Sequence, residues 1–280
     1  MLGHGAETVH LVTHHFSDLP HTPADLFPSL ASWLRASWWM PPNGSIHGSQ
    51  LDRLLGLNLL LICGFFLLAH LFLVVPQLRK QGGNSPPRRM LVIEILSLAF
   101  IGGVFVWMTI TSQQLWANSR FTGSSPEAMQ AEIVGVQFHL YFRYPGSDQT
   151  FGKVKPELAD APGGNPLGID AADPDGKDDI VSSELVLPVG REVDLRLRSQ
   201  DVMHGFFIPG MRIKQDAVPG MVLHIHFTPE REGQYPILCS QLCGMGHQRM
   251  QARLRVVSLR EFTDWLGQRE AARPAQESGQ

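Results

Sequence analysis

The sequence predicts two membrane-spanning helices followed by an all-β sandwich. Residues 54–75 contain no formal charge, and residues 90–110 contain only one, that of Glu94. Each run has roughly twenty residues, enough at 1.5 Å per residue to cross a hydrocarbon core about 30 Å thick. After residue 113, short runs of β-branched and aromatic residues alternate with Gly and Pro, which is typical of a sandwich or barrel.

The two apolar runs are expected to form a hairpin of helices over about 54–76 and 90–112. One such run could be the core helix of a soluble protein, but two in succession favour a membrane anchor. The loop between them lacks acidic residues and has four basic ones: Arg79, Lys80, Arg88 and Arg89. By the positive-inside rule this loop is cytoplasmic, so both termini lie on the other side. In a bacterium, that side is the periplasmic face of the inner membrane.

The rest of the chain divides by composition into three parts. Residues 1–50, in which Arg35 is the only basic side chain, are expected to form an extracytoplasmic leader. Residues 130–267 form the β domain, and residues 268–280 a flexible tail. Ser258 and Glu261 fit a capping box that opens a short helix ending near Gly267.

Within the β domain, alternating or continuous apolar runs predict the strands. They are expected at 132–143, 185–187, 192–199, 205–208, 221–227, 233–238 and 251–257. Residues 145–179 are rich in Gly, Pro and Asp and are expected to form a long loop. The spacing of its aspartates does not match an EF-hand, so a solvated acidic loop is expected rather than a calcium site.

The most specific chemical signal is the sequence CSQLCGMGHQRM at 239–250, with His204 upstream of it. Thiolate and thioether ligands mixed with imidazole favour copper over hard ions. A blue-copper site needs one Cys, whereas two Cys allow two thiolates to bridge two metals. A disulfide and a zinc site with two Cys and two His are the alternatives, and neither gives Met250 a role. The remaining cysteine, Cys63, is expected to be a small buried hydrophobe.

This array resembles the dicopper CuA site of cytochrome c oxidase subunit II. That family has a His at the end of one strand and the pattern Cys-x-x-x-Cys-x-x-x-His-x-x-Met in a later loop. The segments 201–209 and 214–220 are also similar to the family, and the resemblance extends over roughly residues 50 to 265. It implies a cupredoxin-like Greek-key sandwich after the membrane hairpin.

The resemblance also implies a role for each candidate ligand. Cys239 and Cys243 would bridge two copper ions. His204 and Met250 would complete one copper, and His247 and the backbone carbonyl of Gln241 the other. The chain would accept electrons from an extracytoplasmic cytochrome c type donor. It would pass them to haem in subunit I, where haem and CuB reduce oxygen to water and protons are translocated.

Three positions bear on further partners. Many relatives have Glu where this chain has Gln241, and its side chain binds magnesium at the subunit I interface, so a magnesium site is doubtful here. Relatives have Trp in the first extramembrane strand, whereas residues 137–141 have none, so the donor could be membrane-bound or held in a supercomplex. For Glu94, one alternative is a snorkelling side chain near the interface, paired with Arg88 or Arg89. The other follows from its resemblance to the Glu that marks a proton channel into subunit I, which makes it the candidate for proton entry.

Other functions are less well supported by the sequence. The formal net charge of −3 gives no sign of nucleic-acid binding. The CuA subunit of a nitric oxide reductase remains an alternative, as does a copper carrier or assembly protein. A carrier must release its metal, whereas a cage of many ligands suits retention.

Overall fold

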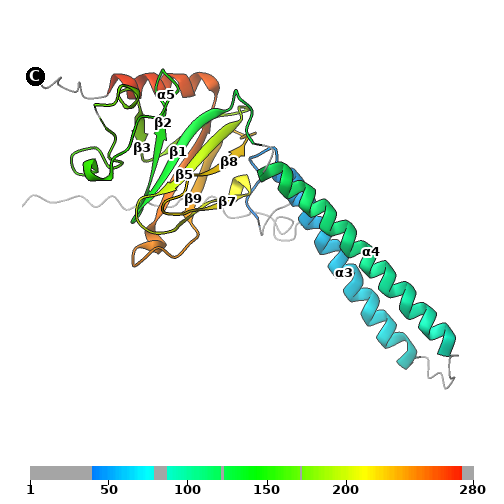
Figure 1. Cartoon of the computed structure of the whole chain (residues 1–280). Helices are drawn as coiled ribbons and strands as arrows, with labels where there is room; N and C mark the ends of the chain where they lie inside the picture. The colour runs from blue at the N-terminus through cyan, green and yellow to red at the C-terminus, as the bar shows by residue number, and fades with distance from the viewer. Residues whose placement is uncertain (1–39, 79–86, 121–122, 171, 273–280) are drawn as a thin grey trace, which may run out of the picture. The chain divides into compact units, whose positions relative to one another are not determined.

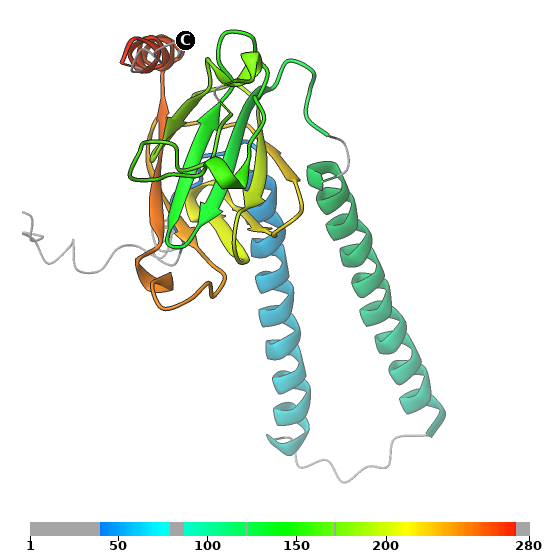
Figure 2. The same ribbon diagram turned by 60° about the vertical axis from the view of Figure 1, so that its left-hand side comes forward.

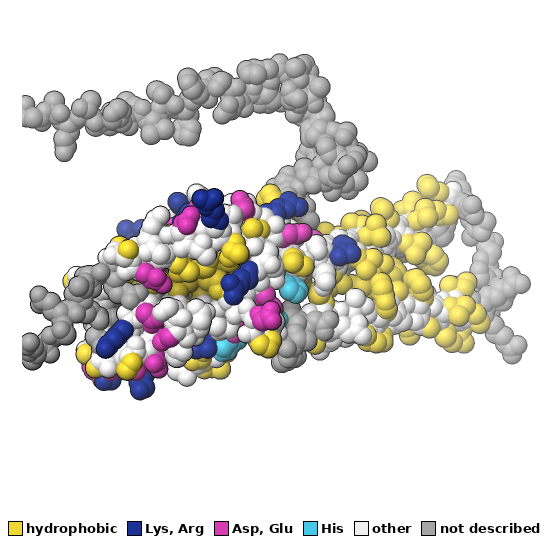
Figure 3. Space-filling model, turned by 90° about the horizontal axis from the view of Figure 1, so that it is seen from above, with side chains coloured by type: hydrophobic (Ala, Val, Ile, Leu, Met, Phe, Trp, Pro, Cys, Tyr) yellow, Lys and Arg dark blue, Asp and Glu magenta, His cyan; other side chains and the backbone are white. Residues whose placement is uncertain are grey.

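The computed structural model describes residues 40–78, 87–120, 123–170 and 172–272. Two helices come first, α3 (Gly48–Leu78) and α4 (Pro87–Arg120). Within them, the 28 residues Gly48–Val75 and the 27 residues Leu91–Ala117 are long and apolar enough to cross a membrane. Their apolar side chains are mostly exposed. Figure 3 shows these side chains over the helices, whereas most charged side chains in that view lie on the β domain. Such exposure is expected of helices that face lipid or other subunits.

Both helices extend beyond the ranges expected from the apolar runs. Hydrogen bonding within a helix continues into polar flanking residues, so hydropathy alone predicts helices that are too short at both ends. Cys63, expected to be buried, is exposed on α3. That prediction was wrong because α3 is apolar all round and has no protein core around it in the described part of the chain.

The β domain has two five-stranded sheets that pack as a sandwich (Figures 1 and 2). One sheet has the order β3-β2-β1-β5-β8 and the other β4-β10-β9-β6-β7. Their bounds are β1 Met129–Val136, β2 His139–Tyr144, β3 Ile180–Ser182, β4 Leu185–Pro188, β5 Val193–Ser199, β6 His204–Ile208, β7 Ile213–Ala217, β8 Leu223–Phe227, β9 Gly233–Cys239 and β10 Gln251–Val257. Most neighbours are antiparallel, but β1 pairs with β5 and β4 with β10 in parallel. The predicted fold class, two apolar helices followed by a β-sandwich, is confirmed.

Three strand predictions differ from the structure. Residues 132–143, expected as one strand, form the hairpin β1–β2, with Glu132 opposite Arg143. The turn of this hairpin contains no Gly, Pro or Asn, so the sequence lacks the residues that usually indicate a hairpin turn. Strands β3 and β7 were not predicted. Both lie at sheet edges, where a strand is short or partly exposed and its apolar alternation is weak.

The core lies between the sheets, where alternate residues of the strands point inward. Leu195, Phe206 and Ile237 are almost wholly buried there. The Tyr144 hydroxyl donates to the carbonyl of Val186 at 3.1 Å and accepts from its N–H at 2.6 Å, which links β2 to β4 in the other sheet. Burial raises the pKa of Tyr144 above its ordinary value.

Helix α5 (Leu259–Ala271) packs on the sandwich through two aromatic side chains. The ring of Trp265 lies 5.1 Å from that of Tyr144, and Phe262 is also buried. The Ser258 side chain accepts from the N–H of Glu261, as the predicted cap requires. The helix continues past the expected end near Gly267, so residues 268–271 are helical rather than part of a tail. Residues 273–280 lie outside the described part.

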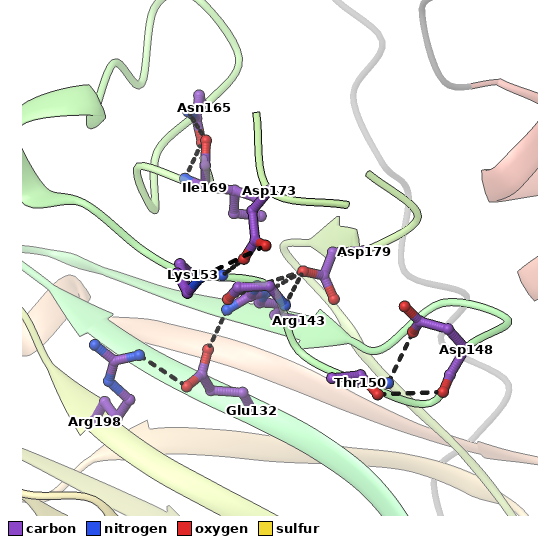
Figure 4. A network of polar contacts seen from close by, with 11 residues as sticks. Glu132, Arg143, Asp148, Thr150, Lys153, Asn165, Ile169, Asp173, Asp179 and Arg198 are labelled. Carbon is purple, nitrogen blue, oxygen red and sulfur yellow. Dashed lines mark hydrogen bonds and ion pairs between the residues drawn. The ribbon is translucent and has the colours of Figure 1, made fainter. Parts of the chain in front are cut away.

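The long loop after β2 is not simply a solvated acidic segment, as the sequence suggested. Arg143 of β2 is buried and contacts Asp179 and Glu132, the latter at 3.2 Å (Figure 4). Asp179 also accepts from the N–H of Gly152, so it fastens the start of the loop to its end. The prediction failed because charge density alone does not show that a carboxylate has a buried guanidinium partner.

The chain divides into two units, residues 1–42 and 43–280. Most of the expected leader, residues 1–39, lies outside the described part. The described residues after it join the β domain: Ser45 is buried and donates to the carbonyl of Met211 at 2.9 Å. At the start of α3, Asp52 accepts from Arg212 at 2.8 and 3.0 Å.

Candidate metal centre

The candidate ligands gather at the loop between β9 and β10, at the end of the sandwich opposite α5 (Figures 1 and 2, orange). Cys239 is the last residue of β9, and His204 is the first of β6. Antiparallel pairing of β6 with β9 places Phe206 opposite Cys239 and so brings His204 to the same end. Ligand atoms of His204, Cys239 and Cys243 lie within 4.8 Å of one another. This is the arrangement that the sequence predicted.

The two cysteines are close but not bonded to each other. Their sulfur atoms are 3.8 Å apart, far longer than the roughly 2.05 Å of a disulfide. The Cys243 sulfur also lies 3.6 Å from Sδ of Met250 and 3.7 Å from Nδ1 of His247. Met250 is buried, so its thioether is directed into the cluster rather than into solvent. The disulfide alternative is therefore not supported.

The backbone carbonyl of Gln241 also faces the cluster. Its oxygen lies 3.2 Å from the Cys239 sulfur. Because the atom in contact belongs to the backbone, the contact does not depend on the type of residue at this position. The ligand positions implied by the resemblance thus lie close together around the two sulfurs.

His204 presents one ring nitrogen to the cluster and the other to a carboxylate. Its Nε2 lies 2.7 Å from Oδ1 of Asp201. Its Nδ1 is buried and has no hydrogen-bond partner among the described residues. Hydrogen bonding at Nε2 favours the tautomer that leaves the Nδ1 lone pair free for a metal.

Backbone packing makes room for this imidazole. Gly135 of β1 lies against the ring, and a Cβ at this position would come within 2.6 Å of Cδ2 of His204. Any larger residue would displace the ring. Gly135 is therefore part of the site, although it offers no ligand.

Burial shapes the titration of the groups around the cluster. Burial and the neighbouring Cys239 raise the pKa of the Cys243 thiol to about 11. For Asp201, burial alone would raise the pKa, but hydrogen bonds from Gln137, His204 and Val202 outweigh it and hold the pKa below its usual range. The carboxylate is thus charged at neutral pH and able to accept from His204.

The donor set fits copper. Two sulfurs at short separation, a buried thioether and an imidazole with an unpartnered nitrogen are soft or borderline ligands. A zinc site would use the cysteines and histidines but would leave the buried Met250 sulfur unexplained. Glu94 lies in α4 and is not part of this cluster.

Sequence reasoning missed three residues of the site. Asp201 was noted as part of the family pattern and as a charge beside His204, but not as a hydrogen-bond partner of the ring, although its position three residues before His204 suggests one. Gly135 and Gln137 gave no signal in the sequence, because the packing of one sheet on the other brings Gly135 to the His204 ring and Gln137 to the Cys243 carbonyl.

Comparisons with known proteins point to one family. The family model described as cytochrome C oxidase subunit II, periplasmic domain, matches residues 173–257. The alternative cytochrome c oxidase subunit 2 of Bradyrhizobium diazoefficiens is 37% identical over 158 residues, which are 54% of this chain and 54% of that protein. Cytochrome c oxidase subunit 2 of Cereibacter sphaeroides is 25% identical over 249 residues, 81% of this chain and 78% of that protein.

Among solved structures, the periplasmic domain of cytochrome oxidase subunit II of Bradyrhizobium japonicum is similar at 25% identity. The match covers 53% of this chain and 98% of that domain, with a TM-score of 0.39. The chain spans about half the length of the Bradyrhizobium diazoefficiens relative.

The fold and the site define a β-sandwich domain with a candidate copper centre, preceded by two apolar helices. Residues 173–257 match the family model of the periplasmic domain of cytochrome c oxidase subunit II. The resemblance inferred from the sequence is confirmed.

Proposed function

We propose that this chain is the electron-entry subunit of a haem-copper oxidase, with a dinuclear CuA centre at the β9–β10 loop. The observation that carries the proposal is the 3.8 Å separation of the Cys239 and Cys243 sulfurs, with Met250 and His247 beside Cys243. Cys239 and Cys243 would bridge, with His204 and Met250 on one copper and His247 and the Gln241 carbonyl on the other. When bound, two coppers supply one-electron transfer between an extracytoplasmic donor and the haem of subunit I.

The task of the protein residues is to hold this ligand set in a fixed arrangement. His204 and Cys239 sit at the ends of paired strands of one sheet, and the buried Met250 directly precedes β10 of that sheet. Ligands attached to paired strands are held more precisely than ligands on free loops. A site that moves little on electron uptake has a small reorganisation energy for electron transfer. Such a rigid site suits an electron relay better than a carrier, which must release its metal.

The membrane hairpin would anchor the copper domain on the periplasmic side, with both termini on that side. Haem and CuB would belong to subunit I, and the donor would be a cytochrome c or a membrane-bound relative. Glu94 would take up protons from the cytoplasmic side on a face directed at subunit I. A magnesium site beside Gln241 is not proposed, because an amide lacks the charge that this ion prefers.

Metal analysis tests the proposal directly. The full chain, purified in detergent and loaded with copper, should contain two coppers and show a mixed-valence spin signal. Cys243→Ser should abolish that signal. Cys63→Ser is the matched control, because Cys63 lies on α3 outside the cluster and should leave copper content unchanged. A single copper per chain, or stoichiometric zinc in the native protein, would contradict the proposal.

Two further measurements address the alternatives. A copper carrier would lose its metal rapidly to an acceptor protein, whereas the proposed centre should retain it. If the chain co-purifies with the catalytic subunit of a nitric oxide reductase and the complex does not reduce oxygen, the chain is instead the CuA subunit of that reductase.

A further inference from the structure

The turn between β1 and β2 touches the candidate copper loop at two points. The Gln137 side-chain amide donates to the carbonyl of Cys243 at 2.5 Å. The ring of Phe138 lies against Gly246, where an added Cβ would come within 2.5 Å of the ring. Residues 137 and 138 belong to one sheet and Cys243 to a loop of the other, so these contacts join the two sheets at the site.

The same turn is also joined to the imidazole side of the site. The backbone N–H of Gln137 donates to Oδ2 of Asp201 at 2.7 Å, and Oδ1 of that carboxylate lies 2.7 Å from Nε2 of His204. Gln137 therefore takes part in a chain of three hydrogen bonds that runs from the Cys243 carbonyl to the His204 ring. These hydrogen bonds connect the backbone of Cys243 to the His204 ring. The Cys243 sulfur and Nδ1 of His204 take no part in them and stay available to a metal.

We propose that Gln137 is a positioning residue that holds Cys243 and His204 at the separation which the copper centre requires. The proposal deepens the proposed function and rests on it. Residues that hydrogen-bond to metal-bearing segments commonly change metal affinity about 10- to 100-fold when they are replaced. An amide donor suits this role, because the group that it meets is a carbonyl oxygen, which can only accept.

Two replacements separate hydrogen bonding from the filling of space. Gln137→Ala removes the amide but keeps the backbone N–H that binds Asp201. Gln137→Glu keeps the size of the side chain but replaces the donor by a carboxylate facing the Cys243 carbonyl. Gln248→Ala is the matched control, because Gln248 is an exposed glutamine in the same loop.

The measurement is the rate at which copper leaves the loaded full chain when a strong chelator is added at pH 7.5, followed by absorption and by the spin signal. Both Gln137 variants should lose copper about tenfold faster or more than the unmodified chain, and Gln248→Ala at the unmodified rate. The unfolding temperature of the copper-free chain should be nearly the same in all four proteins, because Gln137 lies at an exposed turn.

Two other outcomes would overturn the positioning role, and a third would overturn the proposed function. Copper loss at the unmodified rate from both Gln137 variants would overturn the positioning role. Fast loss from Gln137→Ala with normal retention by Gln137→Glu would show that the side chain only fills space, which also overturns it. An unmodified chain that binds no copper would overturn the proposed function itself.

Discussion

The carboxylate of Asp201 lies 2.7 Å from Nε2 of His204, while Nδ1 of the same ring is buried without a partner among the described residues. One ring nitrogen is thus committed to a charged acceptor, and the other is available to a metal. This hydrogen bond favours the tautomer of His204 whose Nδ1 lone pair is free, as a candidate metal ligand requires.

Met250→Leu should keep both coppers but shift the reduction potential of the centre. A thioether is a weak ligand, and leucine of similar volume fills the buried space beside Cys243. Copper content, the spin signal and a redox titration should be measured together. If copper is lost to the same extent as in Cys243→Ser, the thioether is a principal ligand instead.

Gln241→Ala should leave the copper spectrum nearly unchanged. The backbone carbonyl of residue 241 lies 3.2 Å from the Cys239 sulfur, and alanine has the same carbonyl. Absorption and metal analysis check this expectation. Loss of one copper in this variant would show that the Gln241 side chain takes part in binding.

Arg143→Met should lower the free energy of unfolding by about 3–5 kcal/mol, because it leaves the buried carboxylate of Asp179 without its guanidinium partner and leaves Glu132 with Arg198 alone. Arg198→Met is the control. Arg198 also pairs with Glu132 but its side chain is about one-third exposed, so its loss should cost less than about 1 kcal/mol. Denaturant unfolding of the copper-free chain measures both. Equal effects would mean that burial of the cluster matters little.

The copper-free chain should lose stability as pH rises from about 9 to about 11. The folded state holds the Cys243 thiol protonated up to a pKa of about 11, whereas the unfolded chain releases the proton near the ordinary value of about 9. The contribution is therefore fully present below pH 9 and declines as pH rises through this window. Thermal unfolding at several pH values should show the decline. The decline should be smaller in Cys243→Ser.

Glu94→Gln should slow oxygen turnover of the assembled oxidase while copper content and electron entry stay normal. The reason is the cost of an ionisable group within a membrane helix, which is usually retained for a function. Steady-state oxygen consumption at several pH values measures the effect, with Glu94→Asp as the conservative control. Normal turnover in Glu94→Gln would make this residue an interfacial anchor with no part in proton uptake.

Local patterns were sufficient to predict much of this protein. The two helices follow from apolar length, and the spacing of Cys239, Cys243, His247 and Met250 lies within one loop, so the sequence contains it directly. The cap at Ser258 is likewise a contact between near neighbours. Where a signal was local but weak, as at the turn of the β1–β2 hairpin and the edge strands β3 and β7, the prediction was incomplete.

The tertiary structure decided which distant groups meet. Pairing of β6 with β9 brings His204 to the cysteines, and the β1–β2 turn brings Gln137 to Cys243 across 106 positions of sequence. Burial of Asp179 against Arg143 is decided in the same way, since the charge of a residue does not reveal its partner. The sequence by itself determined which residues are the candidate ligands and that two apolar runs are long enough to cross a membrane. Strand pairing and burial, which depend on contacts between distant residues, determined how the ligands are held.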